Sequence, residues 1–350
     1  MTRLRVAVPA HLLALPAQGG HGKVWHRVLS GLAAQAELVP APGARLRRPD
    51  VTLCSGHDDL PVARGPLVAQ IHEAGWRGAE LEAVVSPEFR AHIEPRTAHA
   101  ARTATLVITG AQRVAEDLSA AYGIDPARLR VVPHGVDPDF RPGRPGGREL
   151  VARHAGTGPR PYVLYAASLH PRKNLPALRE AVARLAAEGL PHVLAIAGGP
   201  APDRADSSEL EAAARAELPG HPGRVVRVGT PTDAELAALM AGADAFCLPS
   251  LYEGFGLTAL EAMACGAPVV AADRGALPEV VGEAGLLVTP DAAGIARGLR
   301  RVLGDRAESE RLRAAGPARA AAFPWSRTVA GWLGVLREAV AGQHLDSRPG

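Results

Sequence analysis

The chain has 350 residues, of which 47% are hydrophobic and 21% charged, with a formal net charge of +3 at pH 7. This length predicts two domains. The composition excludes a disordered chain and a strongly basic nucleic-acid-binding protein. The chain has no run of about 18 apolar residues, which excludes a membrane-spanning helix. Its three cysteines have no C-x-x-C spacing, which excludes a disulfide scaffold and a cysteine-rich metal site and favours a reducing cytoplasm.

Short apolar, β-branched runs alternate with longer Ala-, Leu- and Arg-rich stretches of helical period along the whole chain. The first run, LRVAVPA, is interpreted as a buried strand and not as a secretory signal, because prolines interrupt the apolar stretch. The alternation predicts an α/β protein with two doubly wound parallel sheets. The predicted strands lie at residues 4–8, 50–54, 66–71, 105–109, 130–133, 162–167, 192–198, 225–229, 245–249, 268–272 and 286–289.

The segment 137–161 is rich in proline and glycine and has little periodicity, which predicts an interdomain linker. We therefore expect a first Rossmann-like domain over residues 1–145, a linker over 146–160 and a second Rossmann-like domain over 161–324. An amphipathic helix is predicted at about 325–342. Two such domains are expected to face each other across a cleft and to bind ligands there, at the carboxyl ends of their strands. The dinucleotide fingerprint G-x-G-x-x-G is absent, which disfavours a nicotinamide dehydrogenase.

The strongest chemical signal is the segment 249–288, in which a strand, a glycine-containing turn and a helix over 257–264 follow one another. Gly254, Phe255 and Gly256 present backbone N–H groups at the start of that helix, a position that favours a diphosphate. Glu253 and Glu261 flank the turn, but about 10 Å of turn and helix separates them, whereas a retaining glycosidase pair needs about 5–5.5 Å. Each carboxylate is better placed to accept hydrogen bonds from hydroxyls on one extended ligand.

A second signal is the loop holding Arg172, Lys173 and Asn174, directly after the predicted strand 162–167. Only two of the 39 basic residues are lysines, Lys23 and Lys173, and Asn174 is the one asparagine, so their retention in this composition points to a function. Two adjacent cations at the carboxyl end of a strand are suited to neutralising a departing diphosphate. The alternative is a solvated basic loop.

Two weaker signals lie in the first domain. Gly19 and Gly20 stand between the first strand and the first helix, where they would let a phosphate or sugar approach the backbone, although an ordinary turn explains them as well. His72 directly follows a buried strand, at a position where cleft residues lie. A lone histidine at such a position is otherwise structural.

These residues resemble the family 4 retaining glycosyltransferases of GT-B architecture over most of the chain. The most specific match is the family's E-x7-E motif, here Glu253 to Glu261 inside SLYEGFGLTALEAMACGAPVV. SLHPRKNL is similar to the family's diphosphate-binding loop, and its residues are typical of a mannosyltransferase-like subgroup. RLRVVPHGVDPDFRP is similar to the segment entering the linker, and FPWSRTVAGWLGVLREAV to the C-terminal helix that crosses back to the first domain.

The resemblance implies that a nucleotide sugar is held mainly by the second domain and that its hexose passes to an acceptor hydroxyl with retention, without a metal or cofactor. Arg172 and Lys173 would hold the diphosphate. Glu261 would bind the ribose and Glu253 the transferred sugar, and His72 would lie beside that sugar. The catalytic candidates are thus His72, Glu253, Arg172 and Lys173, and the donor-binding candidates are Gly19, Gly20, Asn174, Gly229, Thr230, Gly254, Phe255, Gly256, Leu257 and Glu261.

The partners implied are GDP-mannose, or a UDP-hexose, as donor and a glycan, a lipid-linked sugar or a small molecule as acceptor. We expect no nucleic acid, a cytoplasmic location and at most peripheral contact with the inner membrane face. Some positions depart from the family: Ala167-Ser168 replaces the usual Gly-Arg, which leaves Arg172 to substitute, and His134 replaces the asparagine of N-G-V-D. The alternatives are a non-catalytic sugar-nucleotide-binding subunit, a GT-B phosphorylase or epimerase, and, more distantly, a nicotinamide enzyme.

Overall fold

The computed structural model describes residues 3–17, 19–41, 48–63, 65–77, 81, 85–200 and 208–346. The chain divides into two compact units. Unit 1 comprises Met1–Gly78, Ser86–Gly135 and Phe323–Gly350, and unit 2 comprises Ala79–Val85 and Val136–Ala322.

Unit 1 is built on a six-stranded parallel sheet in the order β2-β1-β3-β4-β5-β6. The four inner strands β1, β3, β4 and β5 are buried along their whole length, which explains why their sequences are continuous apolar runs. The strands are β1 (Arg5–Pro9), β2 (Glu37–Ala41), β3 (Val51–Ser55), β4 (Leu67–Gln70), β5 (Leu106–Thr109) and β6 (Leu129–Val131).

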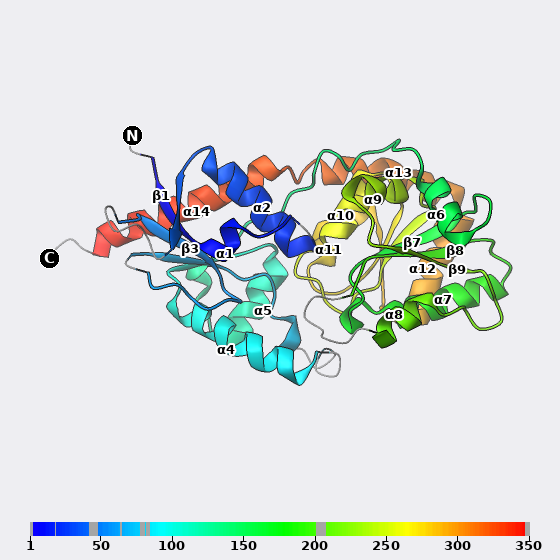
Figure 1. Ribbon diagram of the computed structural model, residues 1–350, viewed down its shortest axis with the longest axis horizontal. Coiled ribbons are helices and arrows are strands. Elements are labelled where there is room, and N and C mark those ends of the chain that lie inside the picture. Colours follow the sequence, from blue (N-terminus) through cyan, green and yellow to red (C-terminus); the bar gives the residue numbers. More distant parts are fainter. Residues whose placement is uncertain are drawn as a thin grey trace. The chain divides into compact units, whose positions relative to one another are not determined.

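Helices cover both faces of this sheet. The C-terminal helix α14 (Trp325–Asp346) packs beside α2 (Gly19–Ala33), and α4 (Pro87–Thr103) and α5 (Gln112–Tyr122) lie on the other face (Figure 1). Trp25 of α2 and Trp332 of α14 are fully buried and meet edge to face at 5.3 Å. The last helix of the sequence is therefore part of the core of unit 1. The short elements of the unit are α1 (Ala10–Leu13), η1 (Gly75–Arg77) and η2 (Pro126–Arg128).

Strand β2 is missing from the sequence prediction. Its sequence, ELVPA, contains Pro40, and only its central residue is buried. Proline in a short, half-exposed run argues against a strand, but an edge strand tolerates it because one side of its backbone has no partner. Pairing with β1 from Arg5–Glu37 to Pro9–Ala41 decides its conformation.

Unit 2 also contains a six-stranded parallel sheet, in the order β12-β11-β10-β7-β8-β9. When β7 is numbered 1 and the sheet is followed from β9 to β12, this is the Rossmann order 3-2-1-4-5-6. The predicted pair of doubly wound sheets is therefore confirmed. The strands are β7 (Tyr162–Ala166), β8 (Val193–Ala197), β9 (Val225–Gly229), β10 (Ala245–Leu248), β11 (Val269–Ala272) and β12 (Leu286–Val288).

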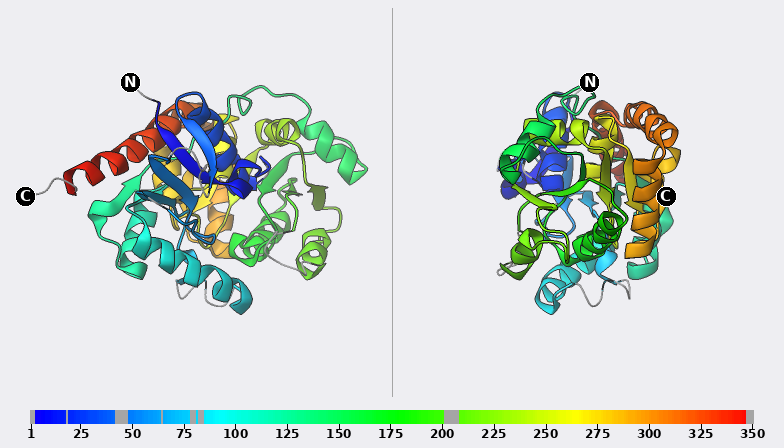
Figure 2. Two further views of the ribbon diagram at one scale, coloured as in Figure 1. Left: turned by 60° about the vertical axis from the view of Figure 1, so that its left-hand side comes forward. Right: turned by 90° about the vertical axis from the view of Figure 1, so that its right-hand side faces the viewer.

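In unit 2, α7 packs against α12, α12 against α13, α13 against α10, α10 against α9 and α9 against α6. Figure 2 shows the molecule from two further sides. The α10 helix begins and ends at the residues predicted from the sequence. The helices are α6 (Gly147–Ala155), α7 (Leu175–Ala187), α8 (Ser208–Arg215), α9 (Asp233–Gly242), α10 (Leu257–Ala264), α11 (Leu277–Val281), α12 (Ala292–Gly304) and α13 (Arg306–Ala320), with the 3₁₀ turns η3 (Pro171–Lys173) and η4 (Gly282–Ala284).

The segment predicted as a linker, 146–160, instead contains helix α6, which packs on α9 and β9 of unit 2. The glycines that suggested a linker cap this helix: Gly146 and Gly156 have φ of +93° and +65°. The division between the units falls between Gly135 and Val136, earlier than the predicted boundary after residue 145.

Each sheet has one point where its connections change direction. In unit 1 this point lies between β1 and β3, and in unit 2 it lies between β7 and β10. Ligands of doubly wound sheets bind at such points, outside the carboxyl ends of the two strands. The loops that follow these four strands are therefore the places to look for a site.

Candidate active site

In unit 2, the loops after β7 and β10 meet at the switch point. The backbone N–H of Leu251 donates to the carbonyl of Arg172 at 2.8 Å, and the side-chain amide of Asn174 donates to the carbonyl of Pro249 at 3.1 Å. Two motifs that the sequence analysis singled out separately, 172–174 and 253–256, are thus parts of one structure.

A buried ion pair joins the two loops. The ammonium of Lys173 donates to Oε1 of Glu253 at 2.6 Å, and the Ser250 hydroxyl donates to the same oxygen at 2.7 Å. Nη1 of Arg172 donates to the carbonyl of Tyr252 at 3.0 Å and lies 3.6 Å from Oε2 of Glu253. The side chains of Lys173 and Glu253 are only 13% and 9% exposed, so the alternative of a solvated basic loop is wrong.

The charges around Glu253 decide its ionisation. Burial acts to raise the pKa of its carboxyl, but the nearby Lys173 and Arg172 charges, with hydrogen bonds from Lys173 and Ser250, bring the pKa below its ordinary value. Glu253 is therefore an anion in the folded protein. Two cations and one carboxylate at this point leave a net positive charge, which suits a diphosphate.

Asn174 has a structural reason for its retention. Its φ of +56° is the one positive value found at a non-glycine residue among those described. Asparagine tolerates this left-handed conformation better than most residues. Its amide nitrogen also donates to the carbonyls of Pro249 and Pro290, at 3.1 and 2.6 Å. The predicted donor-binding residue thus holds the loops after β7, β10 and β12 together and acts as a positioning residue.

Replacing Asn174 with alanine is expected to lower the free energy of unfolding by about 2–4 kcal/mol, from the left-handed backbone and the two lost hydrogen bonds. Asn174→Gly tolerates the left-handed backbone and should lose less of the free energy of unfolding. Comparing the two variants by urea denaturation therefore separates the cost of the backbone conformation from that of the lost hydrogen bonds. Equal stability of Asn174→Ala and the wild type would contradict this role.

The turn before α10 is formed by Gly254, Phe255 and Gly256, of which Phe255 and Gly256 are buried. Gly256, with φ of +94°, stands at the N-cap without a side-chain cap, so the first N–H groups of α10 lack an intrahelical acceptor. The φ of Gly275 is +55°, and a Cβ there would lie 2.5 Å from the Glu253 carbonyl, so only glycine lets this chain hold Glu253 in place. Glu261 is 2% exposed and is buried within α10.

The end of β9 carries the predicted donor-binding residues Gly229 and Thr230. Gly229 has φ of +82°. Arg227, not predicted from the sequence, donates to the carbonyls of Ile196 and Gly229 at 3.1 and 3.2 Å, and pairs with Glu211 at 2.9 Å. Arg227 thereby fixes the carboxyl ends of β8 and β9.

In unit 1, His72 lies in a cluster of imidazoles. Its ring is 4.5 Å from that of His21, 5.8 Å from that of His57 and 6.2 Å from that of His134. Among the described residues, no group of three or more His, Cys, Asp or Glu is placed to hold a metal ion. Hydrogen bonds join His72 to His21 and to His57, and the ring of His134 lies beside His72.

Hydrogen bonds hold two of these rings. The amide of Gln70 lies 2.7 Å from Nδ1 of His72, and Nε2 of His72 contacts Nδ1 of His21. The backbone N–H of His72 donates to Nε2 of His57 at 3.1 Å, so His57 is protonated on Nδ1 and donates to Thr97 at 3.0 Å. The ring of His72 is therefore held in orientation through both of its nitrogens, and the ring of His57 in orientation and in tautomer.

Burial keeps these rings neutral. It lowers the pKa of His57 to about 3, with a further contribution from His21, and the pKa of His134 to about 4, also with a contribution from His21. The pKa of His72 lies well below its ordinary value because of burial and of its three histidine neighbours. At neutral pH, His72 carries no charge, and both of its ring nitrogens already contact side chains of unit 1.

The glycines predicted to lie in a loop of unit 1, Gly19 and Gly20, are instead the first two residues of α2. Gly19, with φ of +66°, begins α2, and a Cβ added at Gly19 or Gly20 would meet no atom within 4 Å among the described residues. Both are exposed, so a ligand can approach the backbone there. Lys23 is 9% exposed within α2.

The sequence analysis missed His21, His57 and Arg227. One signal was available: His11, His57 and His72 each stand two positions after the end of a strand, β1, β3 and β4. The carboxyl ends of parallel strands lie on one edge of the sheet, so this repeated offset predicts a cluster.

The comparisons with known proteins agree with this architecture. A family model described as "Glycosyltransferase Family 4" matches residues 19–140, and one described as "Glycosyl transferases group 1" matches residues 160–305. The MMP α-(1→4)-mannosyltransferase of Mycolicibacterium hassiacum is 32% identical over 315 residues, covering 82% of this chain and 69% of that protein. D-inositol 3-phosphate glycosyltransferase 1 of Catenulispora acidiphila is 36% identical over 302 residues, covering 82% and 71%.

The chain belongs to glycosyltransferase family 4. It spans between 53% and 71% of the length of the curated relatives compared with it. The fold is that of GT-B glycosyltransferases: a sucrose-phosphate synthase from Thermosynechococcus elongatus superposes with a TM-score of 0.74 at 22% identity, covering 97% of this chain and all of that one. HepE from Anabaena, in complex with UDP and glucose, gives 0.70 at 18% identity, covering 99% and 100%. The predicted family and fold are confirmed.

Proposed function

We propose that this protein is a retaining, metal-independent hexosyltransferase that moves a hexose from a nucleoside-diphosphate sugar to an acceptor hydroxyl. The observation that carries the proposal is the buried pair of Lys173 and Glu253 at the switch point of unit 2, beside the uncapped start of α10. Cations and backbone N–H groups receive a diphosphate there, and a carboxylate stands next to them to receive sugar hydroxyls.

In the proposed reaction, Arg172, Lys173 and the N–H groups of 254–257 stabilise the charge that develops on the leaving nucleoside diphosphate. Glu253 accepts hydrogen bonds from the sugar, and Glu261 from the ribose. The backbone at Gly229 and Thr230 lies beside the base. An oxygen of the donor phosphate takes the proton of the acceptor hydroxyl as it attacks the same face of the sugar.

For the donor we propose GDP-mannose first and a UDP-hexose second. One relative is named a mannosyltransferase, which supports mannose, and the HepE structures contain UDP, glucose or UDP-glucose, which supports a UDP-sugar. The acceptor is a glycan, a lipid-linked sugar or a small molecule. We place the reaction in the cytoplasm because the three cysteines are free, buried thiols. No helix in the described ranges is long and apolar enough to cross a membrane.

The first experiment is a thermal-shift panel with GDP, UDP, ADP, dTDP and NAD. A ligand at a hundred times its dissociation constant stabilises the protein by about 2.7 kcal/mol. We expect one nucleoside diphosphate to stabilise the chain and NAD to have no effect. Arg172→Ala should weaken this response, whereas Arg184→Ala, which removes an exposed pair with Glu180 on α7, should not.

Turnover then separates the candidate functions. The corresponding nucleotide sugar should lose its sugar to an acceptor or, slowly, to water, with release of the nucleoside diphosphate. Donor binding with neither reaction would support a binding subunit instead. A requirement for inorganic phosphate would indicate a phosphorylase, and an epimerised donor would indicate an epimerase. A response to NAD alone would overturn the proposal.

A further inference from the structure

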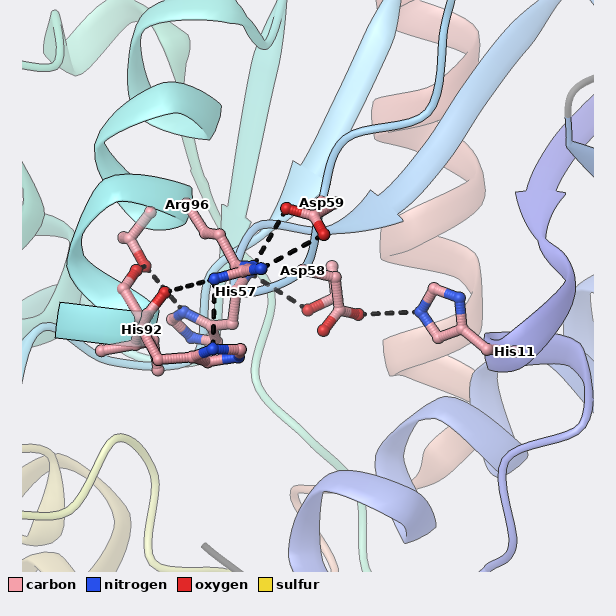
Figure 3. Close-up of polar contacts among 9 residues, drawn as sticks. His11, His57, Asp58, Asp59, His92 and Arg96 are labelled. Atoms are coloured by element: carbon pink, nitrogen blue, oxygen red, sulfur yellow. Dashed lines mark hydrogen bonds and ion pairs between the residues drawn. The ribbon is translucent and has the colours of Figure 1, made fainter. Parts of the chain in front are cut away.

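The switch point of unit 1 carries a pair of side chains that the proposed reaction does not use. His11 lies on α1, directly after β1, and Asp58 lies in the loop after β3, so the two residues flank the point between these strands. Nε2 of His11 is 3.0 Å from Oδ2 of Asp58. Figure 3 shows the imidazole and the carboxylate pointing toward each other from these two segments.

Both groups are accessible. The side chain of His11 is 56% exposed and that of Asp58 is 37% exposed, unlike the buried pair in unit 2. The exposure leaves room for a ligand to hydrogen-bond to the carboxylate and to the ring while they remain in contact. A polar pair that only stabilised the fold at this surface would contribute little, because exposed ion pairs are worth about 0–1 kcal/mol.

The neighbouring carboxylate is engaged differently. Arg96 on α4 pairs with Asp59 through two contacts, Nε to Oδ1 at 3.0 Å and Nη2 to Oδ2 at 3.2 Å (Figure 3). Nη1 of Arg96 also donates to the carbonyl of His92 at 2.7 Å. The guanidinium of Arg96 is thus engaged by Asp59 and by the His92 carbonyl. Asp58 faces an imidazole instead, at the switch point where a ligand is expected.

The pair of Asp58 and His11 favours one chemical class of ligand. A carboxylate accepts hydrogen bonds from two adjacent hydroxyls, and an imidazole can donate or accept one more. A phosphate at the same place would meet the charge of Asp58, and phosphate sites are instead built from arginine, lysine or helix N-termini.

We propose that Asp58 and His11 form the acceptor subsite, that they bind neighbouring hydroxyls of an uncharged sugar or polyol, and that Asp58 disfavours acceptors carrying a phosphate at this position. The inference rests on the proposed function only in naming the bound molecule as the acceptor. The preference for an uncharged over a phosphorylated polyol follows from the two side chains themselves.

The test uses two matched pairs of probes with the full chain: methyl α-D-mannoside against mannose 6-phosphate, and myo-inositol against inositol 3-phosphate. Binding is measured by saturation-transfer NMR. In the wild type, the uncharged member of at least one pair should bind at least tenfold more tightly than its phosphorylated partner. Asp58→Asn should reduce that ratio at least tenfold, and His11→Ala should weaken binding of the uncharged member. Asp117→Asn, which alters an aspartate paired with Arg113 on α5, is the matched control and should leave the ratio unchanged.

Three results would overturn the inference: no binding of either uncharged probe to the wild type, equal or tighter binding of the phosphorylated members, or an unchanged ratio in a folded Asp58→Asn variant. GDP and UDP binding is measured on the same samples. Because nucleotides are proposed to bind unit 2, their failure to bind would overturn the proposed function while the probe ratio still tests the pair of Asp58 and His11.

Discussion

Lys173→Ala is expected to lower the free energy of unfolding by about 3–5 kcal/mol, the range for a buried ion pair that loses one partner. The loss should fall toward the lower end because Arg172 still lies 3.6 Å from the carboxylate. The double variant Lys173→Ala/Glu253→Gln removes the uncompensated charge and should regain most of the lost stability. Urea denaturation of the four proteins in this double-mutant cycle measures the coupling directly.

Nucleotide binding should respond differently from stability. Without Lys173, affinity for the nucleoside diphosphate is expected to fall by about 1.5–3 kcal/mol, the range for a charge-assisted hydrogen bond, or about 10- to 150-fold. The double variant should not regain this affinity, because the cation itself is missing. Titration calorimetry checks the result. Undiminished affinity in Lys173→Ala would contradict the assigned role, and undiminished stability would show that the pair is not coupled.

The same pair predicts a response to acid. Because the pKa of Glu253 in the folded protein is below its ordinary value, the unfolded chain takes up the proton first as the pH falls. The stabilising contribution is therefore complete above the ordinary carboxyl pKa, about 4.3, and is lost as the pH falls through the lowered value. Glu253→Gln should remove this part of the pH dependence.

Unit 1 is expected to lose stability at a higher pH, from about 6.5 downward. The folded unit keeps His134 neutral with a pKa of about 4, whereas the unfolded chain protonates it near the ordinary value of 6.5. The unfolded state binds more protons between these values, so stability falls with falling pH. For His134 the loss is about 2 kcal/mol between pH 6.5 and pH 5, and the lowered pKa values of His57 and His72 act in the same direction.

Tryptophan fluorescence can follow this unit separately. All four tryptophans of the chain, Trp25, Trp76, Trp325 and Trp332, belong to unit 1. Urea denaturation at pH 7, 6 and 5 should show a steep decline in the wild type and a shallower one in His134→Asn, the asparagine being the family's usual residue in this segment. His26→Asn, at an exposed position of α2, serves as control. A decline of the same slope in His134→Asn and in the control would show that this ring is not held neutral.

Much of the fold was predictable because it is encoded locally. Buried parallel strands need continuous apolar runs, and the helices between them need a period of 3.6, so both leave a signal within a short window. The α10 helix is the clearest case: glycine before it and glycine and proline after it mark its bounds at Leu257 and Ala264. Strand β2 and helix α6 were not predictable in this way. An edge strand with Pro40 and a helix flanked by glycines carry weak local signals and are decided by the partners they pack against.

The sequence by itself determined the family, the two parallel sheets and the two loops that carry Lys173 and Glu253, because these features follow from residue types at short spacings. Only the tertiary structure decided that the two side chains form one buried ion pair, that Asn174 bridges two carbonyls, and that His72 joins other imidazoles. It also placed Asp58 against His11. These contacts join segments that follow different strands, and the order of strands in a sheet is set by long-range packing that no short window of sequence contains.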